Sequence, residues 1–134
     1  MSSAASVPLT RHLLRVRDLM DRAYAAPLDV PALARSAHAS ESHFSRSFKA
    51  AFGETPHRYL LTRRIERAKA LLRDGGLPVT EVCLAVGFTS LGSFSATFRR
   101  LVGESPTAYR HRVDLDELAR IPGCLVKRHT RPVA

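Results

Sequence analysis

A nearly repeated stretch of sequence is the strongest constraint on how this chain can fold. FGETPHRYL begins at residue 52, and VGESPTAYR begins at residue 102. When residues 44–59 are aligned with residues 94–109, seven of the sixteen positions are identical. The identical residues of the first copy are Phe44, Ser45, Phe48, Gly53, Glu54, Pro56 and Tyr59. A repeat of this period usually comes from a duplicated supersecondary unit, so the sequence predicts one structural device in two copies.

The spacing of apolar residues predicts that each copy is helical. Phe44, Phe48 and Phe52 recur every four residues, which places them on one face of a helix. Gly53 then suits a left-handed C-terminal cap, and Pro56 suits the first turn of the next helix. The second copy has the same two residues at the equivalent positions, Gly103 and Pro106. A short helix, a tight turn and this Phe-rich helix together predict a helix-turn-helix in each copy.

The full pattern predicts an all-α fold of about seven helices, in which two helix-turn-helix subdomains are joined by a long linker helix. The linker helix is expected to span about 25 Å, at 1.5 Å per residue. We expect residues 1–8 to be a disordered lead-in, residues 9–113 the double helix-turn-helix domain and residues 114–134 a basic C-terminal tail. The expected helices cover residues 9–25, 30–38, 40–52, 56–72, 79–86, 90–102 and 106–113.

The balance of charged residues favours a polyanionic partner. The chain of 134 residues carries 21 Lys and Arg against 12 Asp and Glu, a formal net charge of +9. Such an excess on a small domain favours nucleic acid, ahead of an anionic membrane, an acidic protein or a merely soluble basic domain. No apolar run approaches the roughly 20 residues of a membrane span, and the N-terminus lacks a signal-peptide pattern. We therefore expect a cytoplasmic protein with no membrane partner.

The sequence lacks the patterns of catalysis and metal binding. Its six histidines form no H-x-x-H or H-x-x-x-H pair, and it has no Gly-rich phosphate loop and no nucleophile motif. We therefore expect no enzymatic activity, no metal and no cofactor. Cys83 aligns with Ala34 and is expected in the core, whereas Cys124 is either an inert tail residue or a thiol activated by its basic neighbours.

A duplicated helix-turn-helix suits the recognition of double-stranded DNA. In such a unit the second helix enters the major groove and the first helix crosses above it. Here one chain supplies both units, so a monomer could reach two successive major grooves about 34 Å apart. The alternative is that this geometry only packs a small helical domain.

The segments AHASESHFSRSFKAAFGETPHRYLLTRRIERAKALL and VTEVCLAVGFTSLGSFSATFRRLVGESPTAYR resemble the DNA-binding domain of the AraC/XylS family of bacterial transcription regulators. The resemblance covers residues 9–112. It implies a seven-helix fold that binds DNA as a transcription activator, in the short stand-alone type of the family. On this resemblance the chain is either a complete regulator controlled by its abundance or a fragment of a longer one.

The outward faces of the two Phe-rich helices carry the candidate base contacts. Arg46 matches the arginine of the family's S-R-x-F motif, and an arginine in the groove can hydrogen-bond guanine O6 and N7 together. Ala96 takes this place in the second copy, so we expect that helix to sense thymine methyl groups or DNA shape. A second departure is His38, at a turn where the family often has glycine. Histidine tolerates a positive φ better than most residues, so we expect this turn to be kept. The candidates for base readout are Ser42, Ser45, Arg46, Leu91, Gly92, Ser95 and Ala96.

Basic side chains around the same helices are expected to anchor phosphates, which positions the protein without specifying sequence. Arg64 and Glu66 on the linker helix are expected to form intramolecular ion pairs instead. The candidates for phosphate contact are Lys49, His57, Arg58, Arg99, Arg100, Arg110 and Arg112.

Two other functions stay open beside DNA-binding activation, for which RNA polymerase is the expected protein partner. The chain could be an adaptor that acts mainly through RNA polymerase or another regulator, and the missing arginine at Ala96 favours this reading. It could also be a basic amphipathic membrane binder. Binding to a defined duplex against excess random DNA separates the first function from the others.

Overall fold

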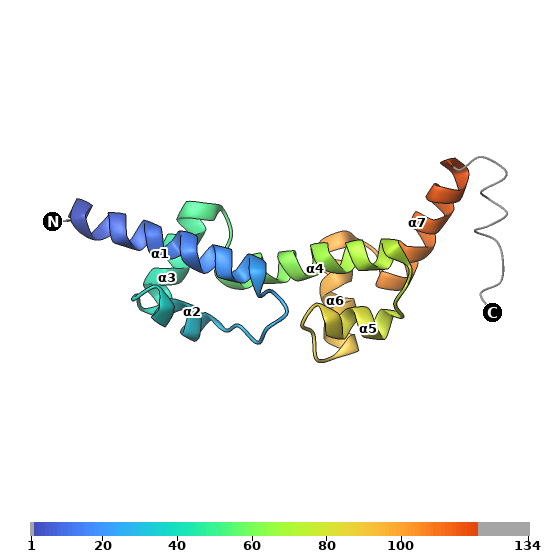
Figure 1. Cartoon of the computed structure of the whole chain (residues 1–134), viewed down its shortest axis with the longest axis horizontal. Helices are drawn as coiled ribbons and strands as arrows, with labels where there is room; N and C mark the ends of the chain where they lie inside the picture. The colour runs from blue at the N-terminus through green and yellow to red at the C-terminus, as the bar shows by residue number, and fades with distance from the viewer. Residues whose placement is uncertain (1, 121–134) are drawn as a thin grey trace.

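The computed structural model describes residues 2–120, with side chains from Leu9 onward. All regular secondary structure in that range is helical, which confirms the predicted all-α fold. The seven helices are α1 (Ser2–Arg22), α2 (Val30–Ser36), α3 (Glu41–Phe52), α4 (Pro56–Asp74), α5 (Val79–Ala85), α6 (Leu91–Val102) and α7 (Pro106–Arg120). Figure 1 shows them gathered into two groups along α4.

The first and last helices are longer than the sequence pattern predicted. Helix α1 begins at Ser2, so it includes most of the segment expected to be a disordered lead-in. The alanines of that segment have high helix propensity, which favours the extension. Helix α7 continues to Arg120, and an ion pair at i, i+4 spacing between Arg112 and Asp116 (3.3 Å) supports its added turns. The expected tail therefore starts inside α7, and its residues 121–134 lie outside the described residues.

The two groups of helices have hydrophobic cores that both draw on α4. The first core is formed mainly by α1, α2 and α3, and the second by α5, α6 and part of α7. Helix α4 contributes Leu60 to the first core and Ile65, Ala68 and Leu72 to the second. Its 19 residues extend over about 28 Å, which lets its two ends belong to different cores. We call α1–α3 with the start of α4 the first unit, and the rest of α4 with α5–α7 the second unit.

The two units repeat the same aromatic packing. In the first unit the Phe44 and Phe48 rings lie 5.8 Å apart, and Phe48 lies 5.5 Å from Tyr59. The equivalent ring distances in the second unit are 5.8 Å and 5.6 Å. Aromatic pairs in these tilted or edge-on arrangements add to the stabilisation from burial alone. The repeated sequence is therefore a repeated core.

Caps and turns fall where the repeat predicted them. At the start of α3, Ser40 Oγ accepts a hydrogen bond from the His43 amide at 3.2 Å, and Gly53 at its end has a φ of 86°. Helix α6 has the same two features. The turns before α3 and α6 also contain a left-handed residue, His38 with a φ of 58° and Gly87 with a φ of 98°. The prediction that histidine keeps the first turn intact is confirmed.

Candidate nucleic-acid interface

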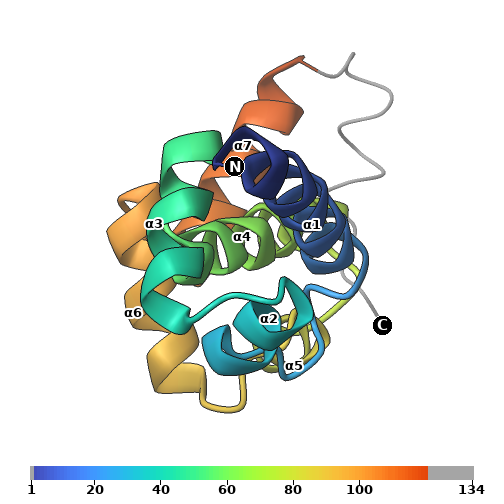
Figure 2. The ribbon, with the colours of Figure 1, turned by 90° about the vertical axis from the view of Figure 1, so that its left-hand side faces the viewer.

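The two Phe-rich helices lie on the same side of the molecule. Figure 2 shows α3 and α6 along one flank and α1 along the opposite flank. Each helix buries its phenylalanine face in the core of its own unit and leaves its other face exposed. The chain thus presents two outer helix faces in one direction, as a protein must to contact one duplex in two grooves.

The outer face of α3 is polar and contains one arginine near its middle. Arg46 is exposed, and its Nη1 donates a hydrogen bond to Ser42 Oγ at 3.3 Å. Ser45, the third base-contact candidate of α3, is half-buried. None of the ion pairs in the described part of the chain involves Arg46. Its charge is therefore available to an acceptor outside the protein, such as a guanine edge.

The corresponding face of α6 is mostly apolar. Leu91 has 44% of its surface exposed, and Gly92 and Ala96 are exposed as well, whereas Ser95 is half-buried. These residues bring short or apolar side chains to the surface, with no charged group before Arg99. Such a face can touch thymine methyl groups but cannot form a bidentate hydrogen bond to a base.

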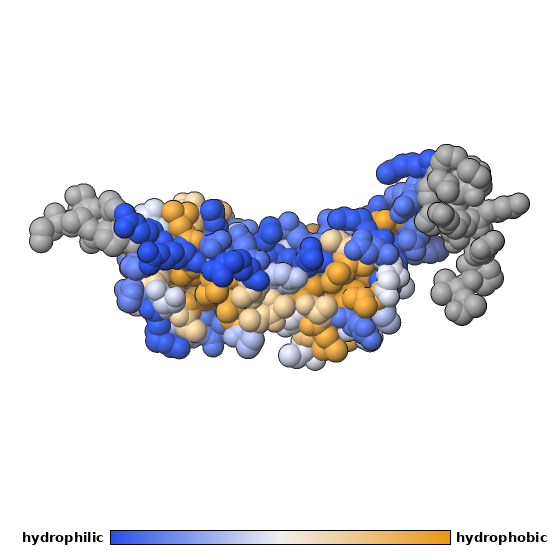
Figure 3. All heavy atoms as spheres, viewed as in Figure 1, coloured by the Kyte–Doolittle hydropathy of each residue, from blue (hydrophilic) through white to orange (hydrophobic). Residues whose placement is uncertain are grey.

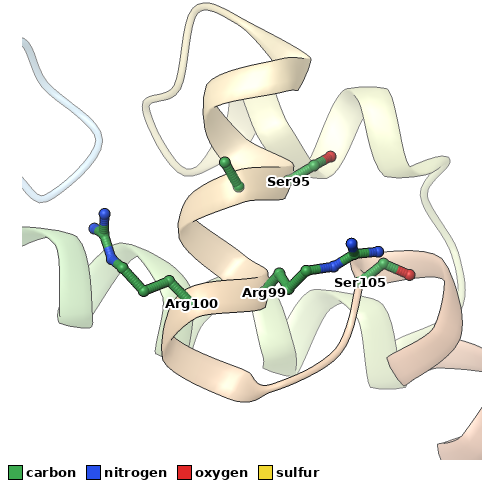
Figure 4. A pocket seen from close by; sticks show the side chains of 5 residues that line it. Ser95, Arg99, Arg100 and Ser105 are labelled. Carbon is green, nitrogen blue, oxygen red and sulfur yellow. The ribbon is translucent and has the colours of Figure 1, made fainter.

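A shallow groove of about 550 Å³ borders α6 and combines this apolar face with positive charge. In Figure 4, Arg99 extends toward Ser105, whereas Arg100 leaves α6 on the other side. Ser105 immediately precedes α7 and caps it, because its Oγ accepts a hydrogen bond from the Ala108 amide at 3.1 Å. The arginines flank a strip that lacks charge, an arrangement that suits phosphates beside a base-contacting surface. The groove is lined by Ser95, Ala96, Arg99, Arg100 and Ser105.

Five of the seven predicted phosphate contacts are exposed side chains at the ends of α3 and α6 or in the first turn of α4. Among them, Arg58 lies 3.7 Å from the carboxylate of Glu54, with 61% of its side chain exposed. An exposed pair of this kind contributes little to stability, so Arg58 can exchange its partner for a phosphate. The five residues are Lys49, His57, Arg58, Arg99 and Arg100.

The other two predicted phosphate contacts, Arg110 and Arg112, are engaged within the protein. Arg110 is half-buried and donates from Nε to the Leu72 carbonyl at 3.2 Å and from Nη2 to the Leu77 carbonyl at 2.6 Å. It thereby fastens α7 to the end of α4 and to the turn after it. Arg112 makes two contacts of 3.0 Å with the Glu104 carboxylate, and these hydrogen bonds raise the pKa of its guanidinium. Because both side chains have intramolecular partners, we expect them to contribute less to phosphate contact than the other five residues, and their contact with DNA stays a prediction.

Of the two ion pairs expected on α4, one forms and one does not. Glu66 pairs with Arg63 at 3.4 Å. Arg64 instead donates hydrogen bonds to the backbone carbonyls of Tyr24 and Ala26 in the loop between α1 and α2. Its burial lowers the pKa of the guanidinium. Backbone carbonyls leave no pattern in a sequence, so sequence reasoning had no signal for these partners.

Two titratable side chains, Tyr59 and Cys83, have raised pKa values. Burial and a 2.7 Å hydrogen bond from the Tyr59 hydroxyl to Asp21 Oδ1 raise the pKa of Tyr59 to about 12. Cys83 is 2% exposed, which confirms its predicted place in the core, and burial raises the pKa of its thiol. A buried thiol of raised pKa forms little thiolate and is unreactive. Cys124 lies outside the described residues.

Residues 2–120 contain neither a metal-binding cluster nor a membrane-spanning helix. No group of three or more His, Cys, Asp or Glu side chains in this range could hold a metal ion. Every helix in the same range is too short or too polar to cross a membrane.

Comparison with known proteins connects this geometry to curated relatives. A family described as helix-turn-helix domain matches residues 33–112. The transcriptional regulator CdhR of Pseudomonas aeruginosa is 32% identical over 124 residues, which cover 92% of this chain and 37% of that protein. The probable transcriptional regulator LumQ of Photobacterium leiognathi is 41% identical over 83 residues, covering 62% of this chain and 34% of that protein. The chain thus spans about a third of the length of these relatives.

Solved structures show the same arrangement of helices. The DNA-binding domain of AdpA, a global transcriptional factor crystallised with a target DNA, matches 81% of this chain and 95% of its own with a TM-score of 0.70 and 31% identity. The C-terminal domain of AraT, a response regulator from Geobacillus stearothermophilus, matches 75% of this chain and 84% of its own with a TM-score of 0.72 and 27% identity. The chain therefore belongs to the AraC-type helix-turn-helix family of DNA-binding transcription regulators.

Proposed function

We propose that this chain activates transcription by binding double-stranded DNA as a monomer in the bacterial cytoplasm, with α3 and α6 in successive major grooves. The observation that carries the proposal is the placement of both outer helix faces on one side of the molecule (Figure 2). A net charge of +9 supplies the attraction to phosphates. The crystallised relative AdpA binds its target DNA through a domain of the same fold.

The two units divide the recognition of bases between them. Arg46, with Ser42 and Ser45 near it on α3, supplies hydrogen bonds to one half-site. Leu91, Gly92, Ser95 and Ala96 supply apolar and short polar contacts to the other half-site, where thymine methyl groups and DNA shape are read. Phosphate contacts by Lys49, His57, Arg58, Arg99 and Arg100 hold both helices in register on the duplex.

Selection of bound sites from random duplexes, in the presence of excess non-specific DNA, tests DNA binding. We expect one enriched sequence whose more sharply defined half contains a G·C pair and whose other half is rich in A·T. Native mass spectrometry of the minimal site should show one chain per duplex, with a footprint of about two helical turns. Enrichment of no sequence at any salt concentration contradicts specific binding, and two chains on the minimal site contradict the monomer.

Activation needs a separate test because the same contacts would also serve a repressor. A reporter promoter carrying the selected site upstream of its polymerase-binding elements should give more transcript when the protein is added to purified bacterial RNA polymerase. A decrease would make the chain a repressor. A rise that survives Arg46→Ala and loss of the selected site would favour recruitment by protein contacts.

The exposed apolar surface of the second unit favours one alternative function, that of an adaptor for RNA polymerase. Leu84 on α5 has 64% of its surface exposed, and Leu91 and Ala96 are exposed on α6. Figure 3, which views the molecule from the α1 side, shows hydrophobic residues around α5, whereas α1 carries mainly hydrophilic ones. Leu84→Glu separates the two functions: it abolishes polymerase capture by an adaptor, and it leaves transcription from the selected site in place if DNA contacts of α3 and α6 suffice.

A further inference from the structure

The loop between α1 and α2 touches the turn between α5 and α6, so the units meet at a second place besides α4. A Cβ atom added at Gly87 would lie 2.9 Å from both the Cα and the carbonyl oxygen of Ala25. Backbone atoms cannot move aside as a flexible side chain can. Figure 1 shows this loop of the first unit reaching the α5–α6 turn of the second.

Arg64 fastens this contact from the α4 side. Its Nε donates to the Tyr24 carbonyl at 2.7 Å, and its Nη2 donates to the Ala26 carbonyl at 2.8 Å, so the planar guanidinium holds the loop on both sides of Ala25. The guanidinium carbon also lies 5.9 Å from the centre of the Phe88 ring in the second unit. The Tyr24 side chain packs against both hydrophobic cores.

The first unit lacks the crowding found at Gly87. The equivalent residue of its turn is His38, which has a φ of 58° and a full side chain whose ring lies 4.8 Å from that of His12. The left-handed conformation is therefore tolerated by a larger residue at one turn, and the absence of a Cβ is required only at the turn that faces the other unit. We call Tyr24, Ala25, Ala26, Arg64, Gly87 and Phe88 the junction.

We propose that the junction sets the separation and rotational phase of α3 and α6, and thereby selects DNA sites by the spacing of their two halves. This inference rests on the proposed function, in which both helices bind one duplex. Helix α4 alone is a single connection about which one unit can twist and bend relative to the other. The junction adds a contact away from the axis of α4, and two separated attachments oppose that rotation.

Spacing is a sensitive readout of this restraint. One inserted base pair turns the second half-site by about 35° and moves it by about 3.4 Å. A rigid pair of units then loses the contacts of one helix, whereas a pair that can rotate keeps both. We expect the wild-type chain to lose about tenfold or more in affinity for each inserted or deleted base pair, a change of 1.4 kcal/mol or more.

The decisive comparison is between Gly87→Ala and Gly103→Ala. The two glycines have φ values of 98° and 96°, but a Cβ at Gly103 meets nothing within 4 Å. Both variants therefore impose similar backbone strain, and only Gly87→Ala disturbs the junction. On selected sites with spacers changed by one base pair, Gly87→Ala should approach equal affinity for all spacings, and Gly103→Ala should keep the wild-type preference. Equal preferences in the two variants would overturn the proposal.

Two further variants cover the case in which Gly87→Ala does not fold. Asparagine tolerates a positive φ, so Gly87→Asn keeps the turn while its Cβ still meets Ala25. Arg64→Lys keeps the charge but cannot donate to two carbonyls from a planar fork. Each variant should bind sites of different spacing with more nearly equal affinity, as expected for Gly87→Ala. If both variants keep the wild-type preference for one spacing, the proposed role of the junction is wrong.

A measurement without DNA separates failure of this inference from failure of the proposed function. Spin labels at Ala51→Cys in α3 and Ala108→Cys in α7, in a Cys124→Ser background, report the distance between the units; Cys83 stays unlabelled because it is buried. The distance distribution should be narrow in the wild-type background and in Gly103→Ala, and broader in Gly87→Ala. A narrow distribution in Gly87→Ala refutes the junction even if no DNA site is found, and a broad one supports it.

Discussion

At the residue scale, one position of the repeat accounts for the chemical difference between the two units. Arg46 and Ala96 occupy equivalent places on α3 and α6, and both are exposed. The arginine brings several N–H donors to the surface, whereas the alanine brings one methyl group. A difference in base recognition between the half-sites follows from this single exchange.

Arg46→Ala should reduce affinity for the selected site by about 1–3 kcal/mol and relax the preference at one base pair, because a bidentate contact to guanine is lost. Arg22→Ala removes the same charge from α1, on the flank away from α3 and α6, and serves as the control. The measurement is a titration of each variant against the selected site and its single-base-pair changes. Equal losses in the two variants would show that Arg46 acts only through net charge.

Tyr59 should make stability depend on alkaline pH. Its pKa is raised to about 12 in the folded chain, against 10.0 for the free side chain, so the fold favours the protonated hydroxyl that donates to Asp21. This contribution is fully present below pH 10 and is lost as the pH rises toward 12. Chemical denaturation across that range should show a steeper fall for the wild-type chain than for Tyr59→Phe. Parallel curves would mean that the hydroxyl contributes nothing in this window.

At the element scale, the repeated Gly, Pro and Phe pattern was enough to predict the helices. The observed roles of side chains differ from the predicted ones where the hydrogen-bond partner is a backbone carbonyl, which no sequence pattern marks. The turn at His38 and the core position of Cys83 were predictable because each depends on local conformation or on the repeat. The role of Arg110 was not, since its acceptors are the carbonyls of Leu72 in α4 and Leu77 in the turn after it, both more than thirty residues away.

Arg112 is a case in which the repeat did carry a usable signal. Glu54 and Glu104 are equivalent, and each is contacted from eight residues further along the chain, by Thr62 Oγ1 at 3.5 Å in the first unit and by Arg112 at 3.0 Å in the second. The sequence itself therefore contained a candidate partner for Arg112, the repeated glutamate eight residues before it.

The cap at the start of α3 gives a prediction at the same scale. Ser40→Ala removes the acceptor of the His43 amide and should lower the free energy of unfolding by about 1 kcal/mol. Ser90→Ala should have a similar effect because its Oγ caps α6 in the same way, at 3.2 Å from the Ser93 amide. Ser36→Ala, at the exposed end of α2, is the matched control. Thermal denaturation measures the three variants. A loss of stability in Ser36→Ala as large as that in Ser40→Ala and Ser90→Ala would contradict the capping role.

At the scale of the whole molecule, the positive charge is divided between residues that hold the fold and residues that face solvent. Arg64, Arg110 and Arg112 hydrogen-bond to carbonyls or carboxylates inside the chain. The net charge of +9 is therefore a poor guide to the number of phosphate contacts.

The four cationic phosphate contacts, Lys49, Arg58, Arg99 and Arg100, should give a slope of about −3.6 in a plot of the logarithm of affinity against the logarithm of salt concentration. Arg99→Ala should flatten this slope by about one and weaken all sequences alike. Arg110→Ala should leave the slope unchanged and lower the melting temperature, because it loses two hydrogen bonds that join α7 to the end of α4 and to the turn after it. Isothermal titration at several salt concentrations, paired with calorimetric melting, tests both variants. A flatter slope for Arg110→Ala would show that Arg110 contacts a phosphate.

The sharing of α4 by two cores limits how such a protein can evolve. The Tyr59 hydroxyl of the first copy donates a hydrogen bond to Asp21 on α1, and the Tyr109 hydroxyl of the second copy accepts one from Arg73 on α4 at 2.9 Å. Helix α4 therefore has the same place beside the second copy that α1 has beside the first. Each buried residue of α4 belongs to one core, but both sets of residues lie on the same helix, so an insertion or deletion between Leu60 and Ile65 displaces one copy relative to the other. A substitution on the outer face of α3 or α6 changes one copy alone. After duplication, the outer faces are therefore free to diverge toward different DNA sequences while the length of α4 must be kept.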